Sequence, residues 1–249
     1  MSDRLEGRNP VLECLVRHRR EVRRIWLDQG AREDDDRLRQ IMSIAAKRSI
    51  PVQRVDRGKL DRMTEGRVHN GVIAEADPLP TWTSRALIEA VFAEGRDPFL
   101  ILADGLQYEH NLGAVLRSAL GFGASGLVIP TRRGADPLSP VVQRVSMGAV
   151  EEVPVVRESL MVALSELKRA GIPIMAADAG GDPISAVDLR GPLALVLGEE
   201  GEGLSPKVRE KCDRIVAVPL AGGLESLNVS VAAAIVMYEK RRQEAAPKV

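Results

Sequence analysis

The feature that most constrains the fold of this chain is a series of six short apolar segments between residues 98 and 219. They are residues 99–103, 126–130, 153–156, 172–177, 193–197 and 215–219. Helical periodicity follows or separates them, at residues 112–122, 139–149, 159–170, 205–212 and 228–244. Continuous apolar strands that alternate with helices are typical of a parallel sheet covered on both faces. We therefore predict an α/β domain over residues 98–249, with ligands bound in the loops at the carboxyl ends of its strands.

The first 77 residues predict a separate, small α/β domain. A helix is expected at residues 9–18, with Asn9 as its N-cap and Pro10 at its first position. The other expected elements are strands at 22–27, 51–55 and 71–76 and a helix at 37–47. Two prolines in residues 77–83 indicate a linker, which a helix at 84–93 follows. The predicted division is thus 1–77, a linker with its leading helix at 78–97, and 98–249.

Composition excludes several classes of protein. Of the 249 residues, 45% are hydrophobic and 28% are charged, as in an ordinary globular protein. No apolar run approaches the roughly 18 residues of a membrane span, and no apolar segment follows the charged N-terminus as in a secretory signal. Cys14 and Cys212 lack partners at metal-ligand spacing. This cysteine usage favours the cytoplasm and argues against disulfides and a metal site.

Charge is distributed unevenly, although the net charge is zero. Residues 1–76 hold 17 Lys and Arg against 13 Asp and Glu, and the rest of the chain holds 18 against 22. The arginines within residues 17–24 offer planar groups that suit phosphates. They would equally suit the solvated face of a helix, so charge alone leaves both interpretations open.

The first of three unusual loops covers residues 104–118 and follows the strand expected at 99–103. Asn111 is placed to cap the helix that comes next. Arg117 lies six residues later, on a different face of that helix. Taken alone, these residues would be an ordinary cap and an ordinary surface arginine.

The second loop covers residues 195–205 and carries glycines at 198, 201 and 203. Glycine permits positive φ and a close approach of the backbone to a ligand. Its acidic residues, Glu199, Glu200 and Glu202, would repel a phosphate, and the loop lacks the Gly-Lys-Ser/Thr ending of a P-loop. An acidic loop instead suits a ligand with a positive charge and a ribose, such as S-adenosylmethionine.

The third loop covers residues 218–233 and repeats the same design. A strand runs into Gly222 and Gly223, after which Ser226 and Asn228 stand at the start of a helix with small residues on its first turns. A Ser or Asn cap is common at a helix start, but it does not explain why the design occurs three times in one domain.

Other catalytic patterns are absent from the sequence. It contains no Gly-x-Ser-x-Gly nucleophile elbow, no His-Glu-x-x-His and no Cys/His cluster. A nucleotide-dependent oxidoreductase would require Gly-x-Gly-x-x-Gly after the first strand, and none is present. Aromatic residues make up only 3% of the chain, which argues against a base-stacking platform.

Taken together, the loops resemble the signature motifs of the SpoU/TrmH family of RNA 2′-O-ribose methyltransferases. The motifs read His-Asn-Leu-Gly-Ala-x-x-Arg-Ser-Ala at 110–119, Leu-Gly-x-Glu-Gly-x-Gly-Leu at 197–204 and Ser-Leu-Asn-Val-Ser-Val-Ala at 226–232. Residues 7–13 and 68–74 resemble the substrate-binding domain of the branch that methylates guanosine in 23S rRNA. The resemblance thus covers nearly the whole chain.

The resemblance implies a SPOUT fold with a deep C-terminal trefoil knot, which is otherwise very rare, and a homodimer that binds structured RNA. It implies S-adenosylmethionine as the cofactor, no metal, and an N-terminal domain similar to a ribosomal protein. The implied cofactor contacts are Gly198, Val218, Leu227 and Ala177. The implied catalytic set is Arg117, Asn111, Glu200, Ser226 and Asn228.

In that set, the resemblance places Arg117 near the ribose 2′-hydroxyl and the neighbouring phosphate. Positioning is favoured over proton abstraction for it, because the pKa of arginine in water is about 12.5–13.8. Asn111 and Asn228 would orient Arg117 and the ribose, and Glu200 would hold that geometry by charge-assisted hydrogen bonds.

One departure from the family pattern is Tyr108-Glu109, where Asp-Pro is common. Losing the proline is expected to alter the loop, and with it substrate choice, more than the chemistry. Two alternatives to the rRNA enzyme are kept: a tRNA ribose 2′-O-methyltransferase and a non-catalytic RNA-binding assembly factor.

Overall fold

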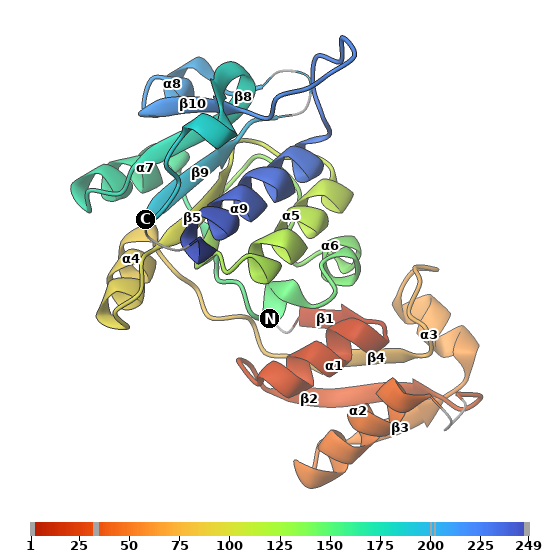
Figure 1. The fold of residues 1–249 in the computed structure, drawn as a ribbon. Coiled ribbons are helices and arrows are strands. Elements are labelled where there is room, and N and C mark those ends of the chain that lie inside the picture. The colour runs from red at the N-terminus through yellow and green to blue at the C-terminus, as the bar shows by residue number, and fades with distance from the viewer. Residues whose placement is uncertain (1–2, 32–34, 200, 202, 247–249) are drawn as a thin grey trace. The chain divides into compact units, whose positions relative to one another are not determined.

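The computed structural model describes residues 3–31, 35–199, 201 and 203–246, and the chain divides into two compact units (Figure 1). The N-terminal unit comprises Met1–Pro80 together with Leu138–Glu152. The sheet unit comprises Thr81–Pro137 together with Val153–Val249. Residues 138–152, which we name the inserted segment, therefore lie within the sequence of the sheet unit but pack with the N-terminal one.

The N-terminal unit is built on a four-stranded mixed sheet of order β1-β4-β2-β3. Its strands are β1 (Asp3–Glu6), β2 (Val22–Asp28), β3 (Val52–Val55) and β4 (Val72–Ala76), and its helices are α1 (Arg8–Arg17), α2 (Asp36–Lys47), α3 (Arg57–Met63), α6 (Pro140–Val145) and the short 3-10 helix η1 (Ala149–Glu151). Strand β4 is antiparallel to β1 and β2, whereas β2 and β3 are parallel. The main core packs α1 and α2 on the sheet around the fully buried Leu15, Ile25 and Ile41.

The sequence predicted five of these elements to within one residue but missed β1 and α3. Strand β1 has four residues, three of them charged, and α3 has seven, so neither shows a clear periodicity. The prediction that Asn9 caps the first helix is wrong. Gly7, with φ of 110°, is the N-cap residue because its amide still bonds to Val72 O while its carbonyl accepts from Val11 N. Asn9 lies inside α1, where its side chain donates to Met147 Sδ at 3.2 Å.

A buried ion pair anchors the inserted segment to the N-terminal unit. The side chains of Arg20 and Glu151 are each only 1% exposed. Arg20 Nε donates to Glu151 Oε2 at 3.0 Å, Nη2 bonds to the other carboxylate oxygen, and Nη1 bonds to Asp3 Oδ2 at 2.5 Å and Asp77 O at 3.1 Å. The same guanidinium thus joins the start of the chain, the end of β4 and the inserted segment. Nearby in α1, burial raises the pKa of the Cys14 thiol to about 12, so that it stays neutral.

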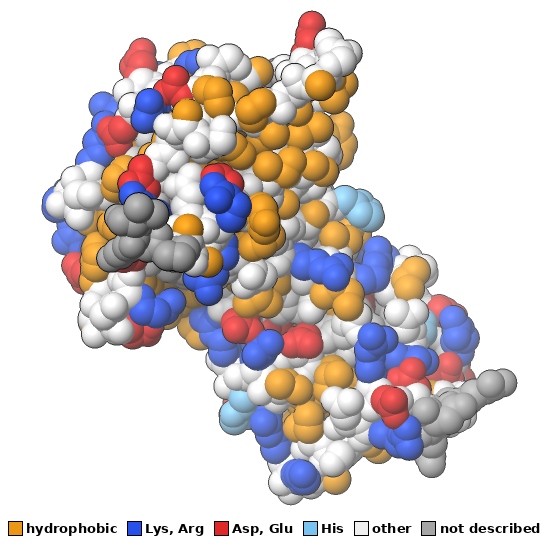
Figure 2. Space-filling model, viewed as in Figure 1, with side chains coloured by type: hydrophobic (Ala, Val, Ile, Leu, Met, Phe, Trp, Pro, Cys, Tyr) orange, Lys and Arg blue, Asp and Glu red, His pale blue; other side chains and the backbone are white. Residues whose placement is uncertain are grey.

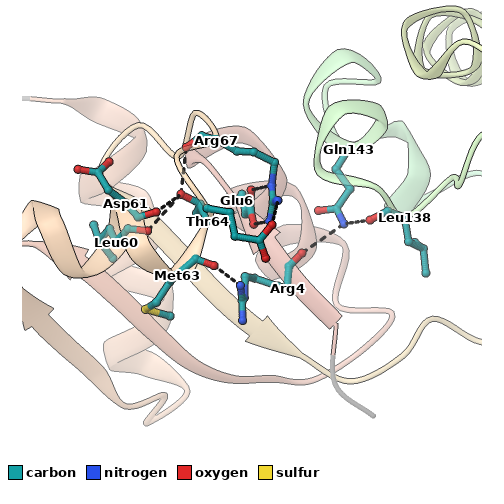
Figure 3. A network of polar contacts seen from close by, with 10 residues as sticks. Arg4, Glu6, Leu60, Asp61, Met63, Thr64, Arg67, Leu138 and Gln143 are labelled. Carbon is teal, nitrogen blue, oxygen red and sulfur yellow. Dashed lines mark hydrogen bonds and ion pairs between the residues drawn. The ribbon is translucent and has the colours of Figure 1, made fainter.

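A second set of polar contacts fixes β1 within the same unit (Figure 3). Gln143 of the inserted segment donates to Arg4 O at 3.3 Å and to Leu138 O at 2.6 Å. The Glu6 side chain, 1% exposed, pairs with Arg67 at 2.9 Å. Strand β1 is therefore held from both sides, by residues that are more than 60 positions away in sequence.

We predict that Glu151→Ala lowers the free energy of unfolding by about 3–5 kcal/mol, because it leaves the Arg20 guanidinium buried without its main partner. Glu152→Ala is the matched control. The side chain of Glu152 is 39% exposed and pairs with Arg17 at the surface, so its loss should cost less than about 1 kcal/mol. Urea unfolding of the full chain measures both, and equal destabilisation by the two variants would contradict this role for the buried pair.

The sheet unit contains a six-stranded sheet of order β10-β8-β9-β5-β6-β7, in which all five pairings are parallel. Its strands are β5 (Phe99–Ala103), β6 (Gly126–Ile129), β7 (Val155–Arg157), β8 (Ile174–Pro183), β9 (Leu193–Leu197) and β10 (Arg214–Ala217). Its helices are α4 (Ser84–Ala93), α5 (Glu109–Gly121), α7 (Leu160–Arg169), α8 (Pro206–Arg209), α9 (Val229–Ala245) and the short η2 (Ile184–Ala186).

Helices cover the large sheet as the apolar pattern predicted. Helices α4 and α7 pack together over alternate strand residues such as Leu100 and Leu102, and α5 packs beside α9 (Figure 1). The predicted α/β class with a parallel sheet is confirmed, and β5, β9 and α4 have the bounds expected. The trefoil knot stays a prediction. Every helix among the described residues is too short or too polar to cross a membrane.

Candidate functional site

A cavity of about 750 Å³ lies at the carboxyl ends of β9 and β10, beside the middle of β8. It is lined by residues 177–180, by residues 197–199 with 201 and 203, by residues 216–220, and by residues 224–229 with 232. The carboxyl ends of parallel strands meet at one edge of a sheet, and ligand sites of α/β proteins form there. The volume falls within the roughly 300–1,000 Å³ of typical small-molecule sites.

One wall of the cavity comes from an interruption in β8. Residues Ile174–Ala177 pair with β9, but the pairing with β10 jumps from Ala176 to Asp182 between Ile215 and Val216. The chain between these points leaves the β10 pairing and lines the cavity. The sequence predicted a strand that ends at 177, so Ala177 was the only residue of this wall that was anticipated.

A second wall comes from the loop after β9, which folds back on itself. The backbones of Glu199 and Gly203 exchange hydrogen bonds of 2.9 and 2.8 Å. A Cβ on Gly198 would lie 2.5 Å from the carbonyl carbon of Gly203, so only glycine allows this close return. Glu200 and Glu202, two of the three acidic residues singled out in this loop, lie outside the described residues.

Every charged side chain among the described lining residues is acidic. Asp178 pairs with Arg209 of α8, and Glu199 pairs with Arg133 at 3.0 Å. Glu225 is exposed at the loop before α9. A positively charged ligand therefore suits the lining better than a polyphosphate does. No group of three or more His, Cys, Asp or Glu that would suit a metal ion occurs in the part of the chain that the structure describes.

The loop before α9 joins the cavity to α5. Asn228 is the N-cap of α9, and its Oδ1 accepts from Ser230 N at 2.9 Å and from Ser230 Oγ at 2.6 Å. Its Nδ2 donates to Asn111 Oδ1 at 3.1 Å. The two asparagines from separate sequence motifs, 117 positions apart, thus meet at the edge of the cavity.

The prediction that Asn111 caps the helix after β5 is wrong. Helix α5 begins at Glu109, and Tyr108 is its N-cap residue without a side-chain cap bond. The Tyr108 carbonyl accepts from the amides of both Asn111 and Leu112, so the helix starts earlier than expected. The Glu109 carboxylate lies in the first turn, where the helix dipole favours negative charge. Asn111 is therefore a residue inside α5, and its side-chain amide contacts Asn228, the N-cap residue of α9.

The structure gathers six of the nine site residues named from the sequence around this cavity. Ala177, Gly198, Val218, Ser226, Leu227 and Asn228 all line it. Asn111 reaches it through Asn228. Arg117 is exposed on α5 and makes no hydrogen bond or ion pair with a residue that the structure describes.

Sequence reasoning missed a link between two of the loops. Asp104, directly after β5, accepts hydrogen bonds from Ser205 N at 3.0 Å and Ser205 Oγ at 2.7 Å. Its own amide donates to Leu197 O at 2.8 Å. The available signal was an aspartate at the end of a buried strand, a position that often holds functional or loop-fixing residues.

Comparisons with known proteins decide the family. Residues 98–238 match the model of the SpoU rRNA Methylase family, and residues 4–82 match the model described as RNA 2′-O ribose methyltransferase substrate binding. The chain belongs to the SpoU rRNA methylase family. This assignment confirms the predicted resemblance, in the large domain and the N-terminal one alike.

Individual relatives extend the match over nearly the whole chain. The 23S rRNA (guanosine-2′-O-)-methyltransferase RlmB of Pseudomonas putida is 36% identical over 97% of this chain and 96% of its own. The SpoU methyltransferase AviRb of Streptomyces viridochromogenes, solved with AdoMet, is 28% identical, with a TM-score of 0.77 over 97% of this chain and 90% of its own. The A. aeolicus TrmH/SpoU tRNA modifying enzyme is 26% identical, with a TM-score of 0.53 over only 64% of this chain and 84% of its own.

We predict that Gly198→Ala weakens S-adenosylmethionine binding at least about tenfold, because the added methyl group collides with the Gly203 backbone and displaces this wall of the cavity. Gly121→Ala is the matched control, since a Cβ there meets no atom within 4 Å. Isothermal titration calorimetry measures the affinity, and circular dichroism confirms that both variants fold. Unchanged affinity for Gly198→Ala would show that the cofactor does not use this cavity.

Proposed function

We propose that this protein transfers the methyl group of S-adenosylmethionine to the 2′-hydroxyl of a guanosine in 23S rRNA. The observation that carries the proposal is the cavity that the second and third motif loops form with residues 177–180 at the carboxyl edge of the sheet. The hydrogen bond between Asn228 and Asn111 joins this cavity to α5, which carries the first motif. Family membership and the relation to the Pseudomonas putida enzyme support the same reaction.

The cavity suits S-adenosylmethionine in size and in the charge of its lining. Gly198, Val218, Leu227 and Ala177 would contact the cofactor, with Gly198 providing the bare backbone that a close-fitting ligand needs. The acidic lining favours its sulfonium, which supplies an electrophilic methyl group. A ligand bound in the cavity would lie near Ser226 and Asn228, which line it at the start of α9.

The polar residues at the cavity edge would prepare the ribose for reaction. Asn111 and Asn228 would orient the ribose, and Ser226 would add a hydroxyl at the same edge. Arg117, exposed on α5, would hold the 2′-hydroxyl and its neighbouring phosphate. We propose Glu200 as the residue that fixes this arrangement. Such alignment supplies on the order of 7–11 kcal/mol in well-oriented reactions, so positioning is sufficient for a large part of the acceleration.

The N-terminal unit favours rRNA over tRNA as the substrate. The tRNA modifying enzyme of A. aeolicus corresponds to only 64% of this chain, whereas the rRNA methyltransferase of Pseudomonas putida corresponds to 97% of it. Residues 4–82 of this chain match a substrate-binding family. We propose that this unit captures the rRNA, and that the protein acts in the cytoplasm, where bacterial rRNA is made and modified.

We predict that Arg117→Ala abolishes methyl transfer to unmodified 23S rRNA while leaving S-adenosylmethionine binding within about twofold. Arg96→Ala is the control, because Arg96 is also exposed but precedes β5, at the opposite end of the strand from the cavity. Transfer of tritiated methyl groups measures the activity, and calorimetry measures the cofactor. Loss of cofactor binding in Arg117→Ala would assign Arg117 to the cofactor site instead. A wild-type protein that binds RNA without transferring a methyl group would favour the assembly factor.

We also propose that two copies of the chain associate through the first turns of α9 and the loop that precedes it. Figure 2 shows hydrophobic side chains gathered over this part of the sheet unit. Four large hydrophobic residues of this loop and helix are exposed: Leu220 38%, Leu224 58%, Val231 48% and Tyr238 55%. A contiguous apolar surface of this kind is typical of a protein interface, and here it lies directly beside the cavity.

We predict that Val231→Asp converts the dimer to a monomer, because a buried, unpaired carboxylate would disfavour the interface. Val162→Asp is the matched control: Val162 lies on α7 and is also 48% exposed. Size-exclusion chromatography with light scattering gives both masses. If Val231→Asp stays dimeric, or if Val162→Asp dissociates as well, the interface does not lie on this face.

A further inference from the structure

Arg133 lies at the carboxyl edge of the large sheet but belongs to none of the three motif loops. It follows β6, and its Nη2 donates to Glu199 Oε2 at 3.0 Å. Glu199 lines the cavity and its side chain is only 19% exposed, whereas the side chain of Arg133 is 61% exposed. The guanidinium is thus anchored to Glu199 through one nitrogen, while most of the side chain is exposed to solvent.

The loop that carries Arg133 is locked to the loop after β5. The amide of Ala135 donates to Leu106 O at 2.7 Å. Gly105 of that same β5 loop lies against Glu199, since a Cβ on it would be 3.2 Å from Glu199 Oε2. The loops after β6, β5 and β9 therefore meet at Glu199, and the β5 loop leads directly into α5 with Asn111. The position of Arg133 is set relative to the residues that would hold the ribose.

A polyanion that approaches this cavity meets an electrostatic obstacle. The described charged residues of the lining are Asp178, Glu199 and Glu225, and an acidic side chain without a counter-charge repels a phosphodiester. Arg209 pairs with Asp178, as Arg133 does with Glu199. Arg133 neutralises Glu199 and still has donors to spare, because a guanidinium carries five N–H groups and Arg133 makes no other hydrogen bond to a residue that the structure describes. Arginine is well suited to a phosphate because of its planar fork.

We infer that Arg133 binds a phosphodiester of the RNA strand next to the target ribose, and that Glu199 is a positioning residue that aims its guanidinium. The inference rests on the proposed function only for which RNA is bound, namely 23S rRNA. The contact between Arg133 and a phosphate does not depend on that choice, because phosphate contacts carry no sequence information. Arg132 is the natural comparison. It is adjacent and exposed, and it makes no hydrogen bond or ion pair with a described residue.

The test measures binding of a radiolabelled, unmodified 23S rRNA transcript to the full-length chain at several salt concentrations. Arg133→Ala should weaken binding about tenfold and reduce the salt dependence by about one phosphate contact. It should raise KM for RNA more than it lowers kcat, and change the calorimetric affinity for S-adenosylmethionine by less than about twofold. Arg132→Ala removes the same charge and should weaken RNA binding by about twofold or less. Arg133→Lys should restore the salt dependence and part of the affinity.

Glu199→Gln distinguishes positioning from simple charge. Removing a negative charge beside the RNA should tighten binding if only the net field matters, whereas the loss of the anchor for Arg133 should weaken binding about threefold. Equal effects of the Arg132 and Arg133 variants, or tighter binding by Glu199→Gln, would overturn the inference. The inference would also be overturned if Arg133→Ala lost cofactor affinity while its RNA affinity stayed unchanged. The Arg133–Glu199 pair would then serve to hold the loop after β9 in place for the cofactor.

The two proposals fail in different ways. If the wild-type protein binds the transcript without methylating it, the proposed function fails. The RNA affinities of Arg133→Ala and Arg132→Ala can still be compared in that case, so the inference about Arg133 is tested independently.

Discussion

All strand pairings in the large sheet are parallel, so the carboxyl ends of its six strands share one edge. The cavity, the Asn228–Asn111 contact and the Arg133–Glu199 pair all depend on this constraint. Loops that follow strands as distant in the chain as β5 (Phe99–Ala103) and β10 (Arg214–Ala217) meet there because the sheet brings them together. Once they meet, the loops need little internal structure of their own, and short polar and glycine-rich segments are sufficient to build a site.

The order and spacing of the apolar runs predicted this arrangement well, because a buried parallel strand leaves a strong local signal. Strands β5 and β9 were placed with their observed bounds for that reason. Two of the loops that line the cavity were also identified, because Gly198 stands directly after a buried strand and Asn228 stands at the start of a helix. The wall formed by residues 177–180 was missed, apart from Ala177. Local signals were therefore sufficient for the fold class and for two of the loops around the cavity.

Contacts between distant residues were beyond the reach of the sequence pattern. The ion pair of Arg20 with Glu151 joins positions 131 apart, and nothing in either segment indicates that residues 138–152 pack with the N-terminal unit. The same holds for Asp104 with Ser205 and for Arg133 with Glu199. Asn111 was assigned as a cap because its residue type favours caps. Helix α5 begins earlier, however, with the Tyr108 carbonyl accepting its first hydrogen bonds, and the side chain of Asn111 instead accepts from Asn228, the N-cap residue of α9. In each case, tertiary structure decided what a polar side chain does.

The central claim is that the cavity at this edge serves ribose methylation of 23S rRNA. The most direct measurement is a map of 2′-O-methylation, read from resistance to alkaline hydrolysis, across the total RNA of a cell that lacks this protein and of the same cell with it restored. The account predicts one methylated guanosine in 23S rRNA that appears only when the protein is restored, with no change in tRNA. A new methylation confined to tRNA, or no new methylation at all, would contradict it.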